Sequence, residues 1–251
     1  MTLLIAGLVT FLFTTLLTIA GVGAAFILVP VFVALGVEVH TAMATALLLN
    51  AISMATASVR FVRRGLVDWS LAIPLLLVAS AMAPLGAWVS QGLARERLLW
   101  MFVAFLLFAA VMMLWYEPRP RTAKVGAWGR LTLGSGVGGV GGFLGGLLGV
   151  GGGGVIVPAL VALGVAPKRA SATTSLVVIF SSLAGFVGHA SLNGLDTPLL
   201  GVTVLGSLGG ALVGSWLMTE RLQGRQVKLV IGVVLLAVAV KMAWSLATGA
   251  T

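Results

Sequence analysis

The sequence predicts an all-α polytopic membrane protein that consists of two inverted repeats, and three observations support this fold class. Hydrophobic residues make up 60% of the 251 residues, charged residues only 8%, and the mean hydropathy is +1.17. Apolar runs of about 20 residues, the helical length that crosses a hydrocarbon core of about 30 Å, recur along the chain. In addition, the two halves resemble one another, and their basic loops alternate in position.

An internal repeat relates the two halves at an offset of 128 residues (149 − 21 = 128). The stretch GVGAAFILVPVFVALGVEVHTAMAT at 21–45 aligns with GVGGGGVIVPALVALGVAPKRASAT at 149–173, with 13 of 25 positions identical. The correspondence continues more weakly further along, where GAW at 86–88 aligns with GSW at 214–216. A repeat of this length indicates two structurally similar halves.

Each half divides into five apolar segments, separated by charged residues or by glycine and proline. In the first half we expect segments at 2–20, 22–36, 40–62, 68–93 and 97–116. In the second half we expect them at 130–149, 153–164, 168–190, 197–220 and 228–247. The second segment of each half is too short to cross comfortably, so it is either a tilted helix or one arm of a re-entrant hairpin. Each repeat is therefore predicted to contain a Gly-broken hairpin plus three transmembrane helices, with 8 to 10 helical segments in all.

The whole chain, residues 1–251, is expected to form a single transmembrane domain. Repeat one covers residues 2–116 and repeat two covers 130–248, and a basic linker at 117–129 joins them. Because Lys and Arg accumulate in short cytoplasmic loops, this linker is assigned to the cytoplasm. The predicted location is the cell membrane as a multi-pass protein, which is the cytoplasmic inner membrane in a bacterium.

Charges at equivalent junctions of the two halves predict that the repeats are inverted. Counted from the linker, the basic junction at 60–64 falls inside, whereas its equivalent at 193–196 has no cation and falls outside. The basic junction at 168–169 also falls inside, and its equivalent at 38–40 falls outside. One basic junction, at 95–97, falls outside against the rule.

Glycines interrupt both halves at corresponding positions, directly before the short second segment. In inverted-repeat transporters, paired Gly-interrupted segments are the best sequence pointer to a substrate site near the bilayer midplane. Glycine lets the backbone approach a ligand, and the start of the next helix offers N–H groups and a positive dipole end to an anion. The candidate substrate-binding residues in these breaks are Gly21, Gly23, Gly149, Gly151, Gly152 and Gly153.

An alternative for any membrane glycine is that it only permits close helix packing. We adopt this interpretation for the glycines at 134–146 and for Gly206, Gly210 and Gly214.

Hydroxyl and amide side chains follow each break on the third segment of its half. The candidate substrate-binding residues here are Thr45 and Asn50 in the first half and Thr173, Thr174 and Ser175 in the second. Neutral donors suit an oxyanion that must be bound and then released. The alternative is that Ser and Thr bond carbonyls of their own helix, and we apply it first to Ser181 and Ser182.

No carboxylate falls at the centre of a predicted segment, because the six acidic residues all lie at segment ends. Proton relays usually use an ionisable group within the membrane, so a carboxylate-coupled antiporter is disfavoured. Proton coupling would then use the substrate itself, or His40 or His189 near the outer boundary. The alternative for His189 is a packed or interfacial imidazole.

The stretch GVGGGGVIVPALVALGVAPKRASATTSLVVIF at 149–180 resembles the signature of the sulfite exporter TauE/SafE (TSUP) family of membrane transporters. The stretch GVGAAFILVPVFVALGV at 21–37 resembles its first-half copy, with Ala24, Ala25 and Phe26 where the second copy has glycines. The resemblance extends over essentially the whole chain. It implies export or uptake of small sulfur-containing anions such as sulfite or organosulfonates.

The predicted function is therefore secondary transport of a small anion, such as sulfite or an organosulfonate, through a midplane site at the repeat interface. The first alternative is a passive anion channel on the same scaffold, and another is a structural or assembly subunit. A membrane enzyme is disfavoured because the chain has no Cys, only two His, and no metal-ligand spacing. We expect no catalytic residue, metal or cofactor. The expected partners are the small anionic substrate and the lipid bilayer, not nucleic acid, and a homo-oligomer is left open.

Overall fold

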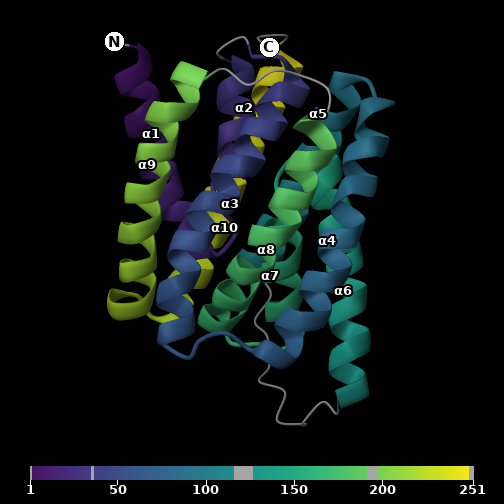
Figure 1. The fold of residues 1–251 in the computed structure, drawn as a ribbon, viewed down its shortest axis with the longest axis vertical. Helices are drawn as coiled ribbons and strands as arrows, with labels where there is room; N and C mark the ends of the chain where they lie inside the picture. Colours follow the sequence, from purple (N-terminus) through teal and green to yellow (C-terminus); the bar gives the residue numbers. More distant parts are fainter. Residues whose placement is uncertain (1, 35–36, 116–126, 191–196, 249–251) are drawn as a thin grey trace.

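The computed structural model describes residues 2–34, 37–115, 127–190 and 197–248. These residues form ten α-helices and one π-helical turn: α1 (Thr2–Ala20), α2 (Ala25–Ala34), α3 (Val39–Arg63), α4 (Trp69–Gln91), α5 (Arg95–Trp115), α6 (Ala127–Leu147), α7 (Gly153–Ala162), α8 (Pro167–Ala190), α9 (Thr197–Trp216), η1 (Leu217–Arg221) and α10 (Gly224–Ala247). Each predicted apolar segment corresponds to one of these helices (Figure 1). The all-α fold is thus confirmed, whereas most of the predicted linker and the junction at 193–196 lie outside the described residues.

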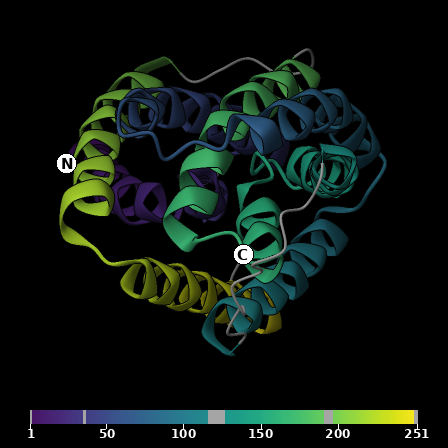
Figure 2. The same cartoon turned by 90° about the horizontal axis from the view of Figure 1, so that it is seen from below.

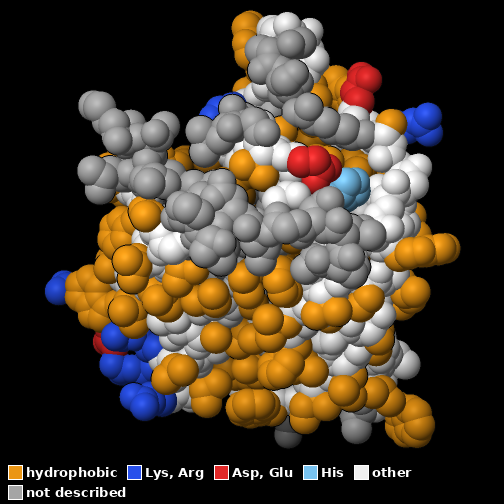
Figure 3. All heavy atoms as spheres, turned by 45° about the horizontal axis from the view of Figure 1, so that its top comes forward, with side chains coloured by type: hydrophobic (Ala, Val, Ile, Leu, Met, Phe, Trp, Pro, Cys, Tyr) orange, Lys and Arg blue, Asp and Glu red, His pale blue; other side chains and the backbone are white. Residues whose placement is uncertain are grey.

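Six of the helices are long and apolar enough to cross a membrane, and they lie at Val39–Arg63, Trp69–Gln91, Glu96–Trp115, Pro167–His189, Gly201–Arg221 and Gly224–Ala247. Helix α6 has 21 residues but is not among the six, because its many glycines contribute little hydropathy. Large apolar side chains are exposed on the flank of the molecule, as Figure 3 shows. These features agree with a multi-pass membrane protein whose flank faces lipid.

Tryptophans near the helix ends point outward. Their exposed fractions range from 39% to 73% at Trp69, Trp88, Trp115, Trp216 and Trp244. Tryptophan is enriched at both membrane–water interfaces, where its ring is partly apolar and its N–H can reach water. These side chains therefore fit the role of interfacial anchors.

Helices α2 and α7 are the short second segments of the two halves. Each has ten residues, a length of about 15 Å, which is about half of a hydrocarbon core of about 30 Å. Both lengths agree with the prediction that these segments are too short to cross comfortably, and the choice between a tilted helix and one arm of a re-entrant hairpin stays a prediction. Figure 1 shows α2 in the upper part of the bundle and α7 in the lower part.

The main helix pairs combine one helix from each half. Helix α4 packs along α6 and α1 along α9, while α3 packs on α8 and α5 on α10 (Figure 2). In the repeat, α1 to α5 correspond in order to α6 to α10. Helix α4 therefore corresponds to α9 and α6 to α1, so the equivalent of the α4–α6 pair in the other half is the α9–α1 pair. Exchanging the halves in this way leaves the α3–α8 and α5–α10 pairs unchanged. A two-fold relation between the halves predicts this pairing, and the inverted orientation in the membrane stays a prediction.

Glycines allow these pairs to approach closely. At Gly138, Gly142 and Gly146 of α6, an added Cβ would overlap the backbone of α4, where small residues such as Ala79 and Ala83 lie opposite. On α9, added Cβ atoms would likewise overlap α1 at Gly206, Gly210 and Gly214. The packing interpretation is therefore confirmed for these six glycines, whereas Gly136, which belongs to the same predicted range, has no atom within 4 Å of an added Cβ.

The basic junctions that the charge pattern assigns to one side share one end of the bundle. Arg64 at the end of α3 forms an ion pair with Glu220 of η1. The Nζ atom of Lys168, at the start of α8, donates to the carbonyl oxygen of Thr219 at 3.4 Å. The junctions at 60–64, 168–169 and 220–221 therefore lie together, at what we call the arginine end. Its assignment to the cytoplasm stays a prediction.

Candidate substrate site at the two glycine breaks

The two glycine breaks pack directly against the opposite half of the molecule. A Cβ added at Gly21 would overlap the backbone of Ser171 on α8, and one at Gly149 would overlap Met43 on α3. These contacts are reciprocal, because Ser171 and Met43 differ by the same offset as the two glycines (171 − 43 = 128). A Cβ at Gly153 would lie 2.7 Å from the carbonyl oxygen of Val22, so the breaks also contact one another.

The backbone of both breaks requires glycine. Five of the six candidate glycines have positive φ, with values of +69°, +83°, +67°, +73° and +80° at Gly21, Gly23, Gly149, Gly151 and Gly152. An L-residue in this region costs about 1–2 kcal/mol, because its Cβ crowds the backbone. Gly153 begins α7 and lacks this constraint, but its contact with the other break excludes a side chain.

Asn50 of α3 lies between the two breaks and is fully buried. Its Nδ2 atom donates to Ser182 Oγ on α8 at 3.0 Å, whereas its Oδ1 atom has no hydrogen-bond partner. An added Cβ would overlap the Asn50 amide from Gly23 on one side and would crowd it from Gly151 on the other. A buried polar atom without a partner costs about 1–3 kcal/mol, so Asn50 is a candidate position for contact with a ligand.

Two serines of α8, Ser181 and Ser182, contact the second break, although sequence reasoning first assigned them to bonds within their own helix. Ser181 Oγ donates to the carbonyl oxygen of Gly151 at 2.8 Å, and Ser182 accepts the bond from Asn50. The sequence contains a signal for this: Ser182 follows Ser175 by seven residues, which places both on one face of a helix.

The hydroxyls predicted on the third helices have different surroundings. Thr45 and Ser175 each donate to a carbonyl of their own helix at 2.8 Å, as the alternative reading expects. Thr173 accepts from the backbone N–H of Asp68 at 3.0 Å, beside the arginine end. It lies nine residues from Ser182, or about 13 Å along α8. Thr174 is buried, and its Oγ1 atom has no partner.

Ser171 supports the first break and was not singled out from the sequence. Its Oγ atom donates to the carbonyl oxygen of Ala20 at 2.9 Å. That carbonyl is one of the last of α1 and lacks a partner within the helix. Ser171 therefore holds the end of α1 directly before Gly21. The serine and threonine cluster at 171–175 is the sequence signal that points to it.

The local electrostatics favour an anion. The first N–H groups of α2 and α7, at 24–25 and 152–154, are buried beside the breaks. The first N–H groups of a helix have no acceptor within it, and this end of the helix dipole is positive. The polar side chains that contact the breaks are neutral donors and acceptors, and they are Asn50, Ser171, Ser181 and Ser182. Such an arrangement is chemically suited to an oxyanion, because it opposes the anion with no fixed negative charge.

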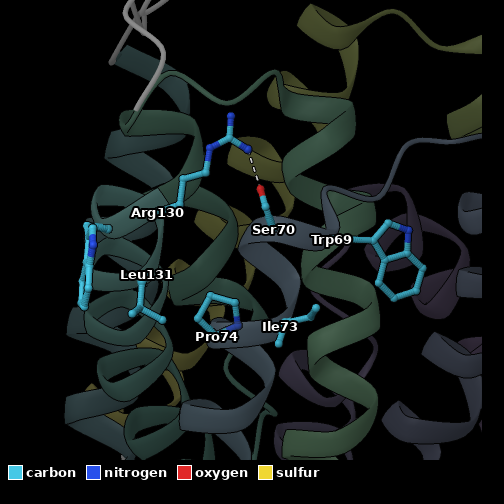
Figure 4. A pocket seen from close by; sticks show the side chains of 7 residues that line it. Trp69, Ser70, Ile73, Pro74, Arg130 and Leu131 are labelled. Atoms are coloured by element: carbon cyan, nitrogen blue, oxygen red, sulfur yellow. Dashed lines mark hydrogen bonds between the residues drawn. The ribbon is translucent and has the colours of Figure 1, made fainter. Parts of the chain in front are cut away.

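A separate groove of about 560 Å³ lies on the outer surface between the starts of α4 and α6. Figure 4 shows its lining, in which Arg130 donates to Ser70 Oγ. Arg130 also forms an ion pair with Asp68 at 3.5 Å. The rims carry Trp69 and Trp128, with exposed fractions of 53% and 80%. This groove therefore opens to the surroundings of the protein and is separate from the buried breaks.

Comparison with known proteins identifies relatives over nearly the whole chain. The family model described as Sulfite exporter TauE/SafE matches residues 6–242, which include both glycine breaks. The chain is also 24% identical over 246 residues to the probable membrane transporter protein YunE of Bacillus subtilis (strain 168). That alignment covers 88% of this chain and 90% of the relative.

Proposed function

This chain belongs to the sulfite exporter TauE/SafE family of membrane transporters, and from this premise we propose that it carries a small sulfur-containing anion, sulfite or an organosulfonate, by secondary transport. The proposed site lies where the two glycine breaks meet. The observation that carries the proposal is the fully buried amide of Asn50, whose Nδ2 donor lies between Gly23 of the first break and Gly151 of the second.

The chemistry of the proposed site suits sulfite and sulfonate. These anions present several oxygens that accept hydrogen bonds, and the starts of α2 and α7 supply N–H donors. The Asn50 amide and the Ser182 hydroxyl are bonded to each other at 3.0 Å and can exchange this bond for one to the substrate. Because neutral donors bind an oxyanion less tightly than a buried cation does, the substrate can leave as well as enter.

The burial of the site supports a carrier rather than a continuously open pore. Asn50, Ser181 and Ser182 are fully buried, and Thr45 is only 6% exposed. A substrate therefore reaches them only when helices move apart on one side. Inverted-repeat transporters achieve this by rocking one bundle against the other around a fixed midplane site. Flux through such a site saturates with substrate concentration.

The test is uptake of labelled sulfite into proteoliposomes that contain the purified protein, with sulfate and toluenesulfonate as competitors. We expect saturable uptake in the wild type and a loss of about tenfold or more in Asn50→Ala, because a donor to the substrate is removed. Ser53→Ala is the matched control. Ser53 is also buried on α3, but its Oγ atom only donates to the carbonyl oxygen of Asn50 at 3.0 Å, so uptake should stay within twofold of wild type, about 0.4 kcal/mol.

Three results would count against the proposal. Wild-type protein of native helical content that gives no uptake above empty liposomes would remove sulfite as the substrate. Uptake that rises linearly with concentration, together with sustained single-channel current, would indicate a channel. Equal uptake by Asn50→Ala and wild type would move the site away from the breaks.

A further inference from the structure

The two histidines of the chain, one from each half, meet at the end of the bundle opposite the arginine end. His40 lies near the start of α3 and His189 near the end of α8, and their ring centroids are 5.9 Å apart. We call this end the histidine end. Figure 3 shows a histidine side chain beside acidic side chains on the surface of this end. The two positions are separated by 149 in sequence (189 − 40 = 149), so this is a contact of the tertiary structure.

The hydrogen bond of His189 identifies which of its ring nitrogens carries the hydrogen. Its Nε2 atom lies 3.0 Å from the carbonyl oxygen of Gly146. A carbonyl only accepts, so Nε2 carries the hydrogen, and Nδ1 of the neutral ring is an acceptor. The Nδ1 atoms of His189 and of His40 are both buried without a hydrogen-bond partner. The two rings therefore offer buried nitrogen sites that a proton can occupy.

Burial increases stepwise from Glu38 at the surface to His40 and then to His189, and we call this the burial gradient. Glu38 is exposed at the N-cap of α3, His40 is half-buried, and His189 is 1% exposed. Burial raises the pKa of the Glu38 carboxyl, but hydrogen bonds from the backbone of His40 and Thr41 outweigh it, so this pKa lies below its usual value. Glu38 is therefore a carboxylate at neutral pH. It places a negative charge at the solvent end of the burial gradient.

The other charged groups of the neighbouring helices lie elsewhere. Among the described residues, α1, α2, α4, α7 and α9 carry no charged side chain. The remaining charges on the helices that pack against α3 or α8 are at the arginine end or exposed at the surface, and they are Arg60, Arg63, Arg130, Lys168, Arg169, Arg225, Lys228 and Lys241. The described residues also contain no group of three metal-binding side chains. The pair thus suits a proton better than a metal ion.

The pair is connected to the second glycine break through Gly146. The carbonyl oxygen that accepts from His189 also accepts from the N–H of Gly149 at 3.2 Å. Gly149 is the first residue of the break and packs against α3. A change in charge or position of the His189 ring therefore acts on the hydrogen bond that begins the break.

We propose that His40 and His189 form a proton-binding pair that couples anion transport to a proton gradient, with one proton moving in the same direction as each anion. The proton enters from solvent past Glu38 and forms an N–H bond on the free imidazole nitrogen of the pair. When the transporter opens to the opposite side, that N–H bond breaks, and the proton passes to water there while the imidazole returns to its neutral form. The added positive charge favours an anion in the same half of the molecule, so proton and anion are held together. This inference rests on the proposed function.

The first test needs no substrate. Because the chain has only two histidines, protein labelled with ¹⁵N-histidine gives two sets of imidazole signals. We expect the two rings to protonate in separate pH steps, because two positive rings 5.9 Å apart repel one another. In His40→Gln, the midpoint of His189 should move by at least 0.5 pH unit, about 0.7 kcal/mol. A His189 midpoint that is the same in both proteins, or a His189 ring that never titrates, would overturn the pair.

The second test separates coupling from transport. In proteoliposomes we compare sulfite accumulation driven by a pH gradient with sulfite exchange at equal pH on both sides. His40→Gln and His189→Gln should keep exchange within twofold of wild type but lose at least tenfold of the gradient-driven accumulation. Glutamine at 189 can still donate to Gly146. Ser58→Ala removes a buried, unpartnered hydroxyl from α3 and should leave both activities unchanged.

Accumulation that persists in both histidine variants would overturn the coupling role, even if exchange supports the proposed function. Wild-type accumulation that does not respond to the pH gradient would do the same. Absence of exchange in folded wild-type protein would instead contradict the proposed sulfite substrate, and the ¹⁵N titration then decides whether the pair binds a proton.

Discussion

At the scale of single residues, the backbone of the glycine breaks and the amide of Asn50 occupy the same small space. Gly151 combines a φ of +73° with close contacts to Ser182 and Asn50. Gly65, in the turn after α3, has a similar φ of +64° but no atom within 4 Å of an added Cβ. Substitutions at the two positions therefore distinguish the free-energy cost of backbone strain, which both carry, from the cost of crowding in the site, which only Gly151 carries.

We expect Gly65→Ala to lower the free energy of unfolding by about 1–2 kcal/mol, because only backbone strain is added. Gly151→Ala should cost about 1–3 kcal/mol more, because the methyl group overlaps Ser182 and crowds Asn50. It should also reduce sulfite uptake, whereas Gly65→Ala should not. Thermal unfolding midpoints in detergent and proteoliposome uptake measure the two effects. Equal midpoints for both variants would show that the second break is not tightly packed.

At the scale of elements, the α4–α6 contact shows that two membrane helices can pack closely through glycines instead of through large apolar side chains. Helix α6 presents Gly138, Gly142 and Gly146 to the α4 backbone, so the helices approach to van der Waals distance. In lipid, such packing replaces the hydrophobic driving force that water provides for soluble helices. The close approach also positions Gly146, which joins His189 to the second break.

Gly142→Leu should disrupt this contact, whereas Gly136→Leu should not. A side chain at Gly142 overlaps the Ala79 backbone, but a Cβ at Gly136 on the same helix meets nothing within 4 Å. We expect Gly142→Leu to lower the free energy of unfolding by at least about 3 kcal/mol, because α6 must shift away from α4. Size-exclusion profiles and thermal midpoints in detergent provide the measurement. A monodisperse Gly142→Leu protein with a wild-type midpoint would contradict the packing seen here.

At the scale of the whole molecule, reciprocal contacts between the halves support the two-fold relation that the repeat predicts. Among the described residues, the arginine end contains the junctions at 60–64, 168–169 and 220–221, which are predicted inside, and the histidine end contains the junction at 38–40, which is predicted outside. A repeat with an odd number of membrane crossings places equivalent junctions at opposite ends, which is how inverted repeats arise.

Labelling of introduced cysteines tests this orientation. Because the chain has no Cys, each variant contains a single thiol. Glu38→Cys at the histidine end and Arg169→Cys at the arginine end replace exposed residues. In sealed cells, an impermeant thiol reagent should label the first variant, whereas the second should react only after the membrane is opened, because positive loops face the cytoplasm. Labelling of both variants from the same side would contradict inverted repeats.

The helices and the repeat were predictable from the sequence, because both depend on local patterns. Apolar length and the glycine, proline and charged residues between segments determine where a membrane helix begins and ends. Thus α1 and the start of α7 coincide with their predicted positions, and the positions of the breaks follow from glycines at 21–23 and 149–154. The family resemblance was likewise contained in these stretches.

The partners of the polar side chains were decided only by the tertiary structure. Asn50 forms a hydrogen bond with Ser182, and the ring of His40 lies near that of His189. Both contacts arise because α3 packs on α8 with one particular rotation and register. Thr173 bonds to Asp68 for the same reason, about 13 Å along the helix from the breaks. A helix pattern shows which residues share a face, but which face meets which neighbour depends on the packing of both halves at once.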